Sequence, residues 1–323
     1  MTVGTVPDQE FIEIFRHHGS PSIVAKVLGI AVRNVCDRRN RLERKYNIQL
    51  PTFADLRTQR DQHHSPPVHA AIHQLRISDG HVVVFSDAHF WPGIRTTAFK
   101  GLLRFVKELR PLAVVCNGDA FDGASISRFP RIGWDKTPTV IQELKACKAA
   151  LGEVEEIAGR AKLIWPLGNH DARFETRLAN QASEFEGVSG FHLKDHLPAW
   201  TPCWRLDVND DVVIKHRIRG GVHATRNNTL NVGRTTVTGH LHQLKVTPLA
   251  DYNGNRYGVD TGTLAEPMGP QFENYLEAGV PDWRSGFAVL TFKSGRLLMP
   301  QLVQKWDEGF VEYAGQVIDV SGE

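Results

Sequence analysis

The sequence of 323 residues has few cysteines and no long apolar run. Its cysteines lie far apart, and no two form a Cys-x-x-Cys pair; they are Cys36, Cys116, Cys147 and Cys203. This spacing argues against a disulfide framework and is typical of reduced thiols in a cytoplasmic protein. No apolar run approaches the length of a membrane span, and the first ten residues do not resemble a signal peptide. We therefore expect a cytoplasmic location and no membrane association.

A charge excess of either sign is also missing. The 38 basic and 36 acidic residues leave a net charge of +2, so any attraction to a polyanion must come from a local cluster. The hydrophobic share of 41% and the charged share of 23% are typical of a globular protein. What the chain has in excess is histidine, with 15 residues, several beside Asp, Asn or Gly after apolar runs.

Changes in sequence pattern predict four regions. Residues 1–50 are predicted to form a small helical domain, and the length of the remainder fits one large α/β domain. Residues 51–80 are polar and broken by proline, which predicts a linker in which His63 and His64 are solvated. Alternating strands and helices begin at His81 and extend over 81–305, and residues 306–323 are expected to form a tail.

The first region is predicted to contain three short helices between residues 7 and 46. Gly19 and Gly29 mark helix ends, and Pro21 follows Ser20 in the arrangement typical of a helix start. In the third helix, Val32, Val35 and Leu42 can face inward. The polar residues expected to face largely outward are Arg33, Asn34, Arg38, Arg39, Arg41, Arg44 and Lys45.

The segment P-S-I-V-A-K-V-L-G-I-A-V-R-N-V resembles a helix-turn-helix DNA-binding unit. The resemblance implies that the helix beginning at Val32 enters the major groove of DNA. Arginine can pair with guanine and asparagine with adenine. The implied DNA-contacting residues are Arg33, Asn34, Arg38, Arg39 and Arg41, with Asp37 as a further candidate. A plain helical subdomain with a solvated basic face, or a head that docks on another protein, remains an alternative.

The larger region is predicted to begin as strand–helix alternation and to become richer in strands. The expected strands cover residues 81–86, 112–116, 163–167, 212–215, 235–238, 244–249, 255–259, 286–292 and 296–303. The expected helices cover residues 95–109, 139–161 and 172–180.

Five blocks rich in metal-ligand residues each follow one of these strands. They are D-A-H from Asp87, G-D-A-F-D from Gly118, G-N-H-D from Gly168, the single His216, and G-H-L-H from Gly239. Loops at the carboxyl ends of strands in an open α/β sheet converge on one crevice. Each block alone is a weak signal, but five in order predict one shared site.

The residue types in these blocks suit divalent cations. Carboxylates, imidazoles and one amide favour ions such as Mn²⁺, which we expect, or Fe²⁺, Ni²⁺ or Zn²⁺. No cysteine is included, which argues against a structural zinc site. Seven ligand groups are too many for one ion and enough for two, and two adjacent ions can activate water and polarise a phosphoryl group.

The block series resembles the motifs of calcineurin-like metallophosphoesterases over residues 82–243. The resemblance implies an α/β fold, a β-sandwich of two mixed sheets flanked by helices, here preceded by the small all-α helix-turn-helix domain. It implies two metal sites, the first held by Asp87, His89 and His242, the second by Asn169, His216 and His240, with Asp119 bridging both. It also implies that His170 donates a proton to the leaving oxygen and that Asp122 orients His170.

The fourth block departs from the family pattern, in which this histidine is usually followed by glycine. Here the chain has K-H-R around His216 and then G-G-V-H-A, which contains His223. We favour His216 because it directly ends a strand. Asp171 is expected to cap the following helix. Nearby arginines could bind phosphate or form a solvated basic surface; they are Arg173, Arg177, Arg217, Arg219 and Arg226.

The second block narrows the expected activity. Protein Ser/Thr phosphatases of this family have Asp-Arg-Gly at its end, whereas Asp122 is followed by Gly123 and Ala124. A DNA-binding head keeps phosphodiesters at high local concentration, which favours a DNA phosphodiesterase or nuclease in the general style of phage or prophage phosphoesterases. The alternatives are a phosphomonoesterase or nucleotide phosphatase with a localising head, and a non-catalytic DNA-binding regulatory protein. The oligomeric state stays open.

Overall fold

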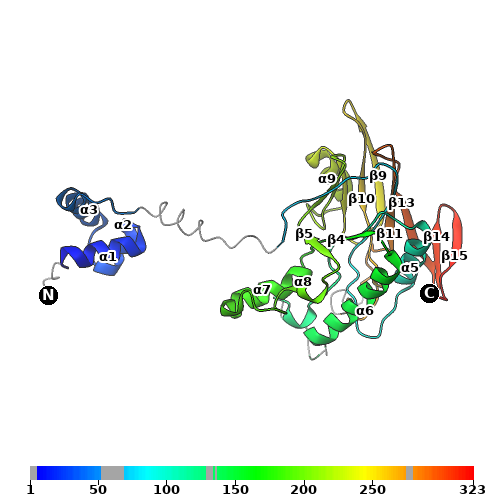
Figure 1. Cartoon of the computed structure of the whole chain (residues 1–323), viewed down its shortest axis with the longest axis horizontal. Helices are drawn as coiled ribbons and strands as arrows, with labels where there is room; N and C mark the ends of the chain where they lie inside the picture. Colours follow the sequence, from blue (N-terminus) through cyan, green and yellow to red (C-terminus); the bar gives the residue numbers. More distant parts are fainter. Residues whose placement is uncertain (1–5, 52–68, 129–133, 135–136, 274–278) are drawn as a thin grey trace. The chain divides into compact units, whose positions relative to one another are not determined.

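The structure is a computed structural model that describes residues 6–51, 69–128, 134, 137–273 and 279–323. The chain divides into two compact units, Met1–Val68 and His69–Glu323 (Figure 1). Within the described residues, no helix is both long and apolar enough to cross a membrane.

The smaller unit contains the three helices predicted from the sequence. They are α1 (Asp8–His18), α2 (Pro21–Leu28) and α3 (Val32–Tyr46). Gly19 and Gly29 end the first two helices with φ angles of 58° and 64°, a left-handed conformation that glycine adopts without a Cβ clash. The helices enclose a small apolar core that contains Phe11, Phe15, Val24, Val35, Leu42 and Leu50. Val32 lies outside this core with 44% of its surface exposed, so the inward face of α3 begins at Val35.

The larger sheet of the second unit has the strand order β15-β14-β13-β11-β2-β3-β4-β5, with β12 paired to β11. Its strands are β2 (Gly80–Phe85), β3 (Ala113–Cys116), β4 (Lys162–Pro166), β5 (Thr201–Cys203), β11 (Gly286–Lys293), β12 (Arg296–Leu297), β13 (Gln301–Asp307), β14 (Phe310–Tyr313) and β15 (Gln316–Asp319). Strands β2 to β5 are parallel, and the pairings that involve β11 to β15 are antiparallel.

The smaller sheet has the order β1-β6-β7-β8-β10-β9 and is also mixed. Its strands are β1 (His73–Leu75), β6 (Leu206–Val208), β7 (Val212–Ile214), β8 (Thr235–Thr238), β9 (Lys245–Asp251) and β10 (Gly254–Asp260). The β7–β8 and β8–β10 pairings are parallel, so these three strands end at the same edge of the sheet.

The two sheets pack face to face, and helices cover the outer faces. Along β2, Val82 and Val84 lie in the core between the sheets, whereas Val83 and Phe85 lie in the core beneath the helices. Burial on both faces explains why this strand reads as a continuous apolar run. The helices over the larger sheet are α5 (Thr97–Leu109), α6 (Val140–Ala158), α7 (Asp171–Gln181) and α8 (Leu193–His196), and α9 (Ala224–Val232) packs against β8, β9 and β10 (Figure 1). The predicted fold class is confirmed.

Three differences from the sequence prediction concern the edges of this unit. Part of the predicted linker forms β1, which pairs in parallel with β6, while residues 52–68, including His63 and His64, lie outside the described residues. The predicted tail instead forms the end of β13 and then β14 and β15 of the larger sheet. The strand predicted over 296–303 is two strands, β12 and β13, because Pro300 cannot donate a ladder hydrogen bond.

Candidate metal centre

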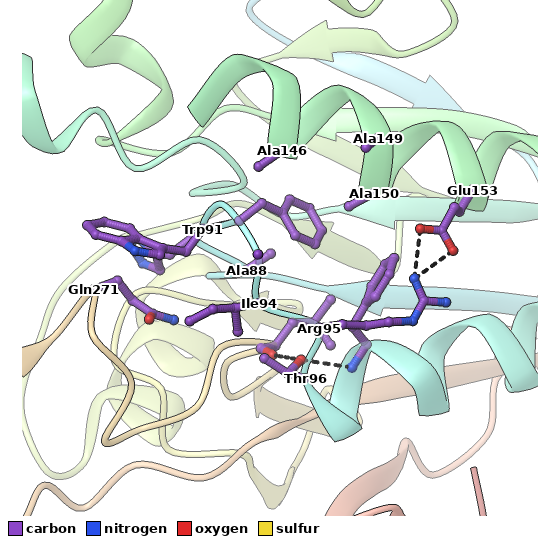
Figure 2. A pocket seen from close by; sticks show the side chains of 15 residues that line it. Ala88, Trp91, Ile94, Arg95, Thr96, Ala146, Ala149, Ala150, Glu153 and Gln271 are labelled. Carbon is purple, nitrogen blue, oxygen red and sulfur yellow. Dashed lines mark hydrogen bonds and ion pairs between the residues drawn. The ribbon is translucent and has the colours of Figure 1, made fainter. Parts of the chain in front are cut away.

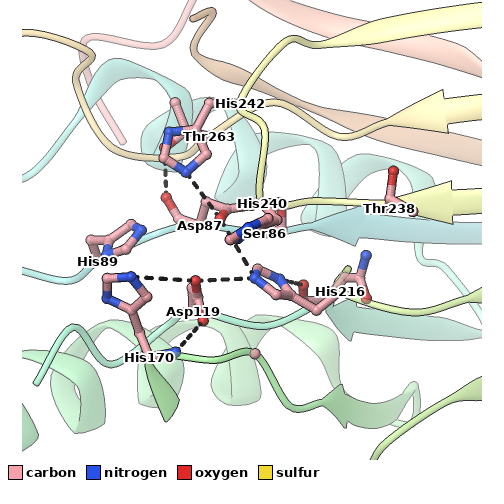
Figure 3. A network of polar contacts seen from close by, with 12 residues as sticks. Ser86, Asp87, His89, Asp119, His170, His216, Thr238, His240, His242 and Thr263 are labelled. Carbon is pink, nitrogen blue, oxygen red and sulfur yellow. Dashed lines mark hydrogen bonds and ion pairs between the residues drawn. The ribbon is translucent and has the colours of Figure 1, made fainter. Parts of the chain in front are cut away.

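The loops that follow β2, β3, β4, β7 and β8 meet at one place (Figure 3). Backbone hydrogen bonds join these loops to one another. The N–H of Asp87 donates to Gly118 over 2.9 Å, the N–H of His89 donates to Asp119 over 3.0 Å, and the N–H of Gly239 donates to His216 over 2.9 Å. Side-chain hydrogen bonds complete the connections, because the N–H of His170 donates to Asp119 and the N–H of His240 donates to Asp87, so the five sequence blocks form one connected set of loops.

Histidine and aspartate side chains form three overlapping groups at this junction. The groups are Asp87–His89–His242, His89–Asp119–His170 and Asp119–His216–His240. In each group the ligand atoms lie within 4.8 Å of one another, the spacing expected around a shared cation. His89 and Asp119 each belong to two groups, so the groups form a continuous chain of ligands, as two adjacent ions require.

Two contacts within the groups join an imidazole nitrogen to a carboxylate oxygen. His242 Nε2 lies 3.0 Å from Asp87 Oδ1, and His216 Nε2 lies 3.0 Å from Asp119 Oδ2. Burial opposes ionisation of Asp87, but the charges of His242 and His216 lower its pKa to about 2. Burial likewise opposes protonation of His216, but Asp119 and Asp87 raise its pKa to about 10.

Several buried candidate ligand atoms at the junction have no hydrogen-bond partner among the described residues, and they include His89 Nε2 and Asn169 Oδ1. Buried polar atoms are normally paired, so unpaired atoms of these residue types fit a bound cation. The Nδ1 atoms of His89 and His216 are fixed, because His216 Nδ1 donates to the carbonyl of Asn117 over 2.8 Å and His89 Nδ1 contacts Asp122 Oδ1 at 2.7 Å. A ring with one nitrogen fixed by the protein in this way is the usual arrangement of a metal-binding histidine.

Most of these ligands have a strained backbone. Asp87, His89, Asp119, His240 and His242 have φ angles of 52°, 40°, 55°, 71° and 58°. Such left-handed conformations cost non-glycine residues on the order of 1–3 kcal/mol each and concentrate at functional sites. Hydrogen bonds of 2.8 Å hold the turns: Asp87 Oδ2 accepts from the N–H of His240, and Asp119 Oδ1 accepts from the N–H of His170.

The glycines of the blocks allow the loops to approach closely. A Cβ atom added to Gly168 would lie 2.0 Å from Asp119 Oδ1, and one added to Gly239 would lie 2.4 Å from Ser86 Oγ. At Gly118 the added atom would lie 2.5 Å from His216 Nδ1. Each glycine therefore leaves space that a side chain of another block or strand occupies.

Asp122 orients two histidines, where the sequence predicted only one. Its Oδ1 lies 2.9 Å from His170 Nδ1 and 2.7 Å from His89 Nδ1. Burial opposes ionisation of Asp122, but these two hydrogen bonds hold its pKa well below the usual range. For His170, burial opposes protonation, but the charge of Asp119 and the hydrogen bond to Asp122 raise the pKa of the ring. Arg173 Nη2 lies 3.1 Å from His170 Nε2.

Asp171 does not cap α7 as predicted. It is the first residue of the helix, and its buried carboxylate accepts four N–H hydrogen bonds. The donors are the backbone of Asp119 and Gly168 at 2.8 Å, the backbone of Phe121 at 3.1 Å and Trp165 Nε1 at 3.1 Å. The N-terminus of α7 lies inside the set of loops, so the carboxylate binds the second block. The sequence analysis also gave no role to Asn117, whose carbonyl accepts the hydrogen bond from His216, although Asn117 directly precedes the second block.

The two candidate histidines of the fourth block differ in burial and in their neighbours. His216 is buried within the third group, whereas His223 is exposed at the N-terminus of α9. Arg217, Arg219 and Arg226 are exposed as well.

The predicted DNA-contacting residues of α3 fall into two sets. Arg33, Asn34 and Arg41 are exposed. Arg38 instead pairs with Asp8 at 3.2 Å and stacks on the ring of Phe11. The prediction that Arg38 and Arg39 lie largely outside is therefore corrected, because both are half-buried and fasten α3 to neighbouring segments. Arg39 contacts Glu43 at 3.0 Å, the carbonyl of Leu50 at 2.9 Å and the ring of Phe15.

Comparison with known proteins gives one family match and several distant relatives. The family described as calcineurin-like phosphoesterase matches residues 80–256. Gene 54 protein of Mycobacterium phage L5 is 26% identical over 249 residues, covering 69% of this chain and 92% of that protein. Zinc-complexed Vps29 from Entamoeba histolytica shares 13% identity with a TM-score of 0.41, covering 74% of this chain and 99% of that chain. A dimetal phosphatase from Danio rerio shares 10% identity with a TM-score of 0.37, covering 71% and 96%.

Proposed function

Since the chain belongs to the calcineurin-like phosphoesterase family, we propose that it is a phosphodiesterase of DNA that uses two divalent cations. The family match makes it a metallophosphoesterase, and the proposal concerns the substrate and the ions. The observation that carries it is the chain of three overlapping ligand groups joined by His89 and Asp119. A single ion would need only one of these groups. In a purely structural site we would expect every ligand atom to be paired, whereas His89 Nε2 and Asn169 Oδ1 have no partner among the described residues and His170 is only half-buried.

The ligands divide between two proposed sites. Asp87, His89 and His242 would hold the first cation, Asn169, His216 and His240 would hold the second, and Asp119 would be shared by both. Oxygen and imidazole ligands together favour Mn²⁺, which we propose as the working ion. Bound divalent cations in such a site lower the pKa of water and offset the negative charge that develops on the phosphoryl group.

His170 supplies the proton that the leaving oxygen needs. Its Nδ1 is fixed by Asp122 at 2.9 Å, so Nε2 is the atom available for proton transfer. In the structure Arg173 donates toward Nε2. When Nε2 carries a proton both groups are donors, so Arg173 must turn away, and its guanidinium is then free to bind phosphoryl oxygens.

DNA is proposed as the substrate because of the smaller unit. Arg33, Asn34 and Arg41 lie exposed on α3, the helix that the helix-turn-helix resemblance assigns to the major groove. A unit that holds DNA raises the concentration of phosphodiesters near the metal centre of the same chain.

Hydrolysis of two chromogenic esters tests the proposal. Wild type and Asp119→Asn are assayed with Mn²⁺ on bis-p-nitrophenyl phosphate and on p-nitrophenyl phosphate. Diester cleavage that the substitution abolishes is the expected result. Cleavage of the monoester alone would indicate a phosphomonoesterase or nucleotide phosphatase. DNA binding with no hydrolysis of either ester would indicate a regulatory protein, and either result would overturn the proposal.

A further inference from the structure

A cavity of about 240 Å³ lies beside the metal centre, between residues 88–96 and α6 (Figure 2). Three aromatic side chains line it, Phe90, Trp91 and Phe99, together with Ala146, Ala149 and Ala150 of α6. The alanines leave a flat wall because their spacing places them on one face of the helix. A cavity with aromatic side chains and a flat aliphatic wall suits a planar ring.

The charges at the cavity favour a neutral occupant over a phosphate. Arg95 and Glu153 are its charged residues besides the metal-ligand candidate His89. Arg95 Nη1 lies 2.8 Å from both carboxylate oxygens of Glu153 (Figure 2). Its guanidinium stacks on the ring of Phe99. Since the arginine is already neutralised, an anion would meet the carboxylate without a compensating cation.

The polar side chains of the cavity differ in whether they are paired within the described residues. The hydroxyl of Thr96 donates to the carbonyl of Leu264 over 2.5 Å, so it is occupied. The amide oxygen of Gln271 is buried and has no hydrogen-bond partner among the described residues. A side-chain amide carries both an acceptor and donors, so Gln271 can bond to the edge of a heterocyclic ring. A neutral aromatic ring with polar edge atoms is the chemistry of a nucleobase.

The cavity and the metal centre share a residue, since His89 lines the cavity and belongs to two of the ligand groups. We propose that the cavity binds the base of the nucleotide next to the phosphate held at the metal centre, which rests on the proposed function. A base can enter such a cavity only after leaving the base stack, and this costs a few kcal/mol in a duplex. The inferred substrate is therefore a nucleotide that is already unpaired, in single-stranded DNA or at a frayed end.

Ligand-observed NMR with 2′-deoxyadenosine tests the cavity without any hydrolysis, and 2-deoxyribose is the matching ligand that lacks a base. The probe carries no phosphate, so its binding reports the cavity alone. The variant is Ala149→Leu, which places a larger side chain at an exposed position of the cavity wall. Lys148→Leu is the control, because Lys148 is exposed on the same helix and does not line the cavity.

We expect the wild type and Lys148→Leu to bind deoxyadenosine about tenfold or more tightly than deoxyribose, and Ala149→Leu to lose this preference. Equal binding of the two ligands, or an unchanged preference in Ala149→Leu, would overturn the inference. Trp91→Ala provides a second variant and should also weaken deoxyadenosine binding, by loss of a stacking surface. The ester assay separates the two proposals: base binding without diester hydrolysis would contradict only the proposed function.

Discussion

The buried carboxylate of Asp171 accepts a hydrogen bond of 2.8 Å from the backbone N–H of Asp119. Asp119 is the carboxylate shared by two ligand groups, and its φ of 55° needs support from its neighbours. Asp171 also accepts from the N–H of Gly168, which precedes Asn169 in the chain. One side chain therefore fixes two of the five blocks relative to each other, although it lies outside the ligand groups.

Asp171→Asn should loosen both blocks. The amide keeps one acceptor oxygen and turns an NH2 group toward buried N–H donors, so we expect the free energy of unfolding to fall by about 2–4 kcal/mol. Affinity for Mn²⁺ should fall as well. Urea unfolding and calorimetric titration measure the two effects. Asp211→Asn, at an exposed position, is the control and should change neither quantity. Full Mn²⁺ affinity in Asp171→Asn would contradict the positioning role.

Asp119→Asn and His170→Gln should separate metal binding from proton transfer. Asp119 is shared by both proposed sites, so its substitution should lower the bound metal below two ions per chain. His170→Gln should keep the full metal content and lower kcat on a diester with a poor leaving group by roughly 10²–10⁴-fold. Elemental analysis of the purified proteins checks the stoichiometry. Loss of one ion from His170→Gln would mean that this histidine is a ligand, as its place in the second group also allows.

The two fourth-block histidines form a matched pair. His216→Ala removes the imidazole whose Nε2 lies 3.0 Å from Asp119 Oδ2, so metal content and hydrolysis should both be lost. His223→Ala removes an exposed ring and should leave the metal content at the wild-type value. The reverse pattern in elemental analysis would show that His223, and not His216, is the metal ligand.

The exposed arginines of α3 should contribute to DNA binding, whereas the half-buried Arg38 should contribute to the stability of the smaller unit. Arg33→Ala together with Arg41→Ala removes exposed charges, so DNA binding should weaken and its salt dependence should decrease. Arg38→Ala breaks the ion pair with Asp8 and should instead lower the melting temperature of the smaller unit. Fluorescence anisotropy of labelled DNA over a salt series, with circular dichroism melting, distinguishes the two. DNA binding that is unchanged in the double variant would remove the case for DNA contact by α3.

Glu143 should make stability depend on pH. Burial and the charge of Asp122 raise its pKa from the ordinary 4.5 to about 7. Between these values the folded protein holds a proton that the unfolded chain releases, so this contribution to stability decreases as pH rises from 4.5 to 7. The pKa difference corresponds to an effect of up to about 3 kcal/mol. Glu143→Gln should flatten the curve of unfolding free energy against pH, measured with a chelator in both proteins. Parallel curves would contradict the raised pKa.

The apolar strands and the blocks after them could be predicted from the sequence, because both signals are local. A buried parallel strand such as β2 is a continuous apolar run, and the ligand types directly follow it. The parallel strands β2, β3 and β4 then bring the first three blocks to one edge of a sheet. The fold class follows from the same alternation of strands and helices.

What could not be predicted depends on partners distant in the chain. Arg38 is a basic residue on a basic helix, and only the position of Asp8 makes it an internal contact. Asp171 occupies a position typical of a helix cap, and only the approach of Asp119 gives it another role. The strands β1, β14 and β15 are only three or four residues long, too short for a clear pattern, and pairing with a neighbouring strand determines their structure.

The left-handed backbone conformation at five candidate ligands lowers the stability of the fold while it positions their side chains; the residues are Asp87, His89, Asp119, His240 and His242. Glycine at any of these positions would relieve the strain and remove a ligand in one step. Selection for thermal stability of the metal-free chain alone would therefore erode the site. Each of these side chains lowers the free energy of unfolding while it places a candidate ligand atom at the proposed cation site, and binding of a cation there would raise that free energy again.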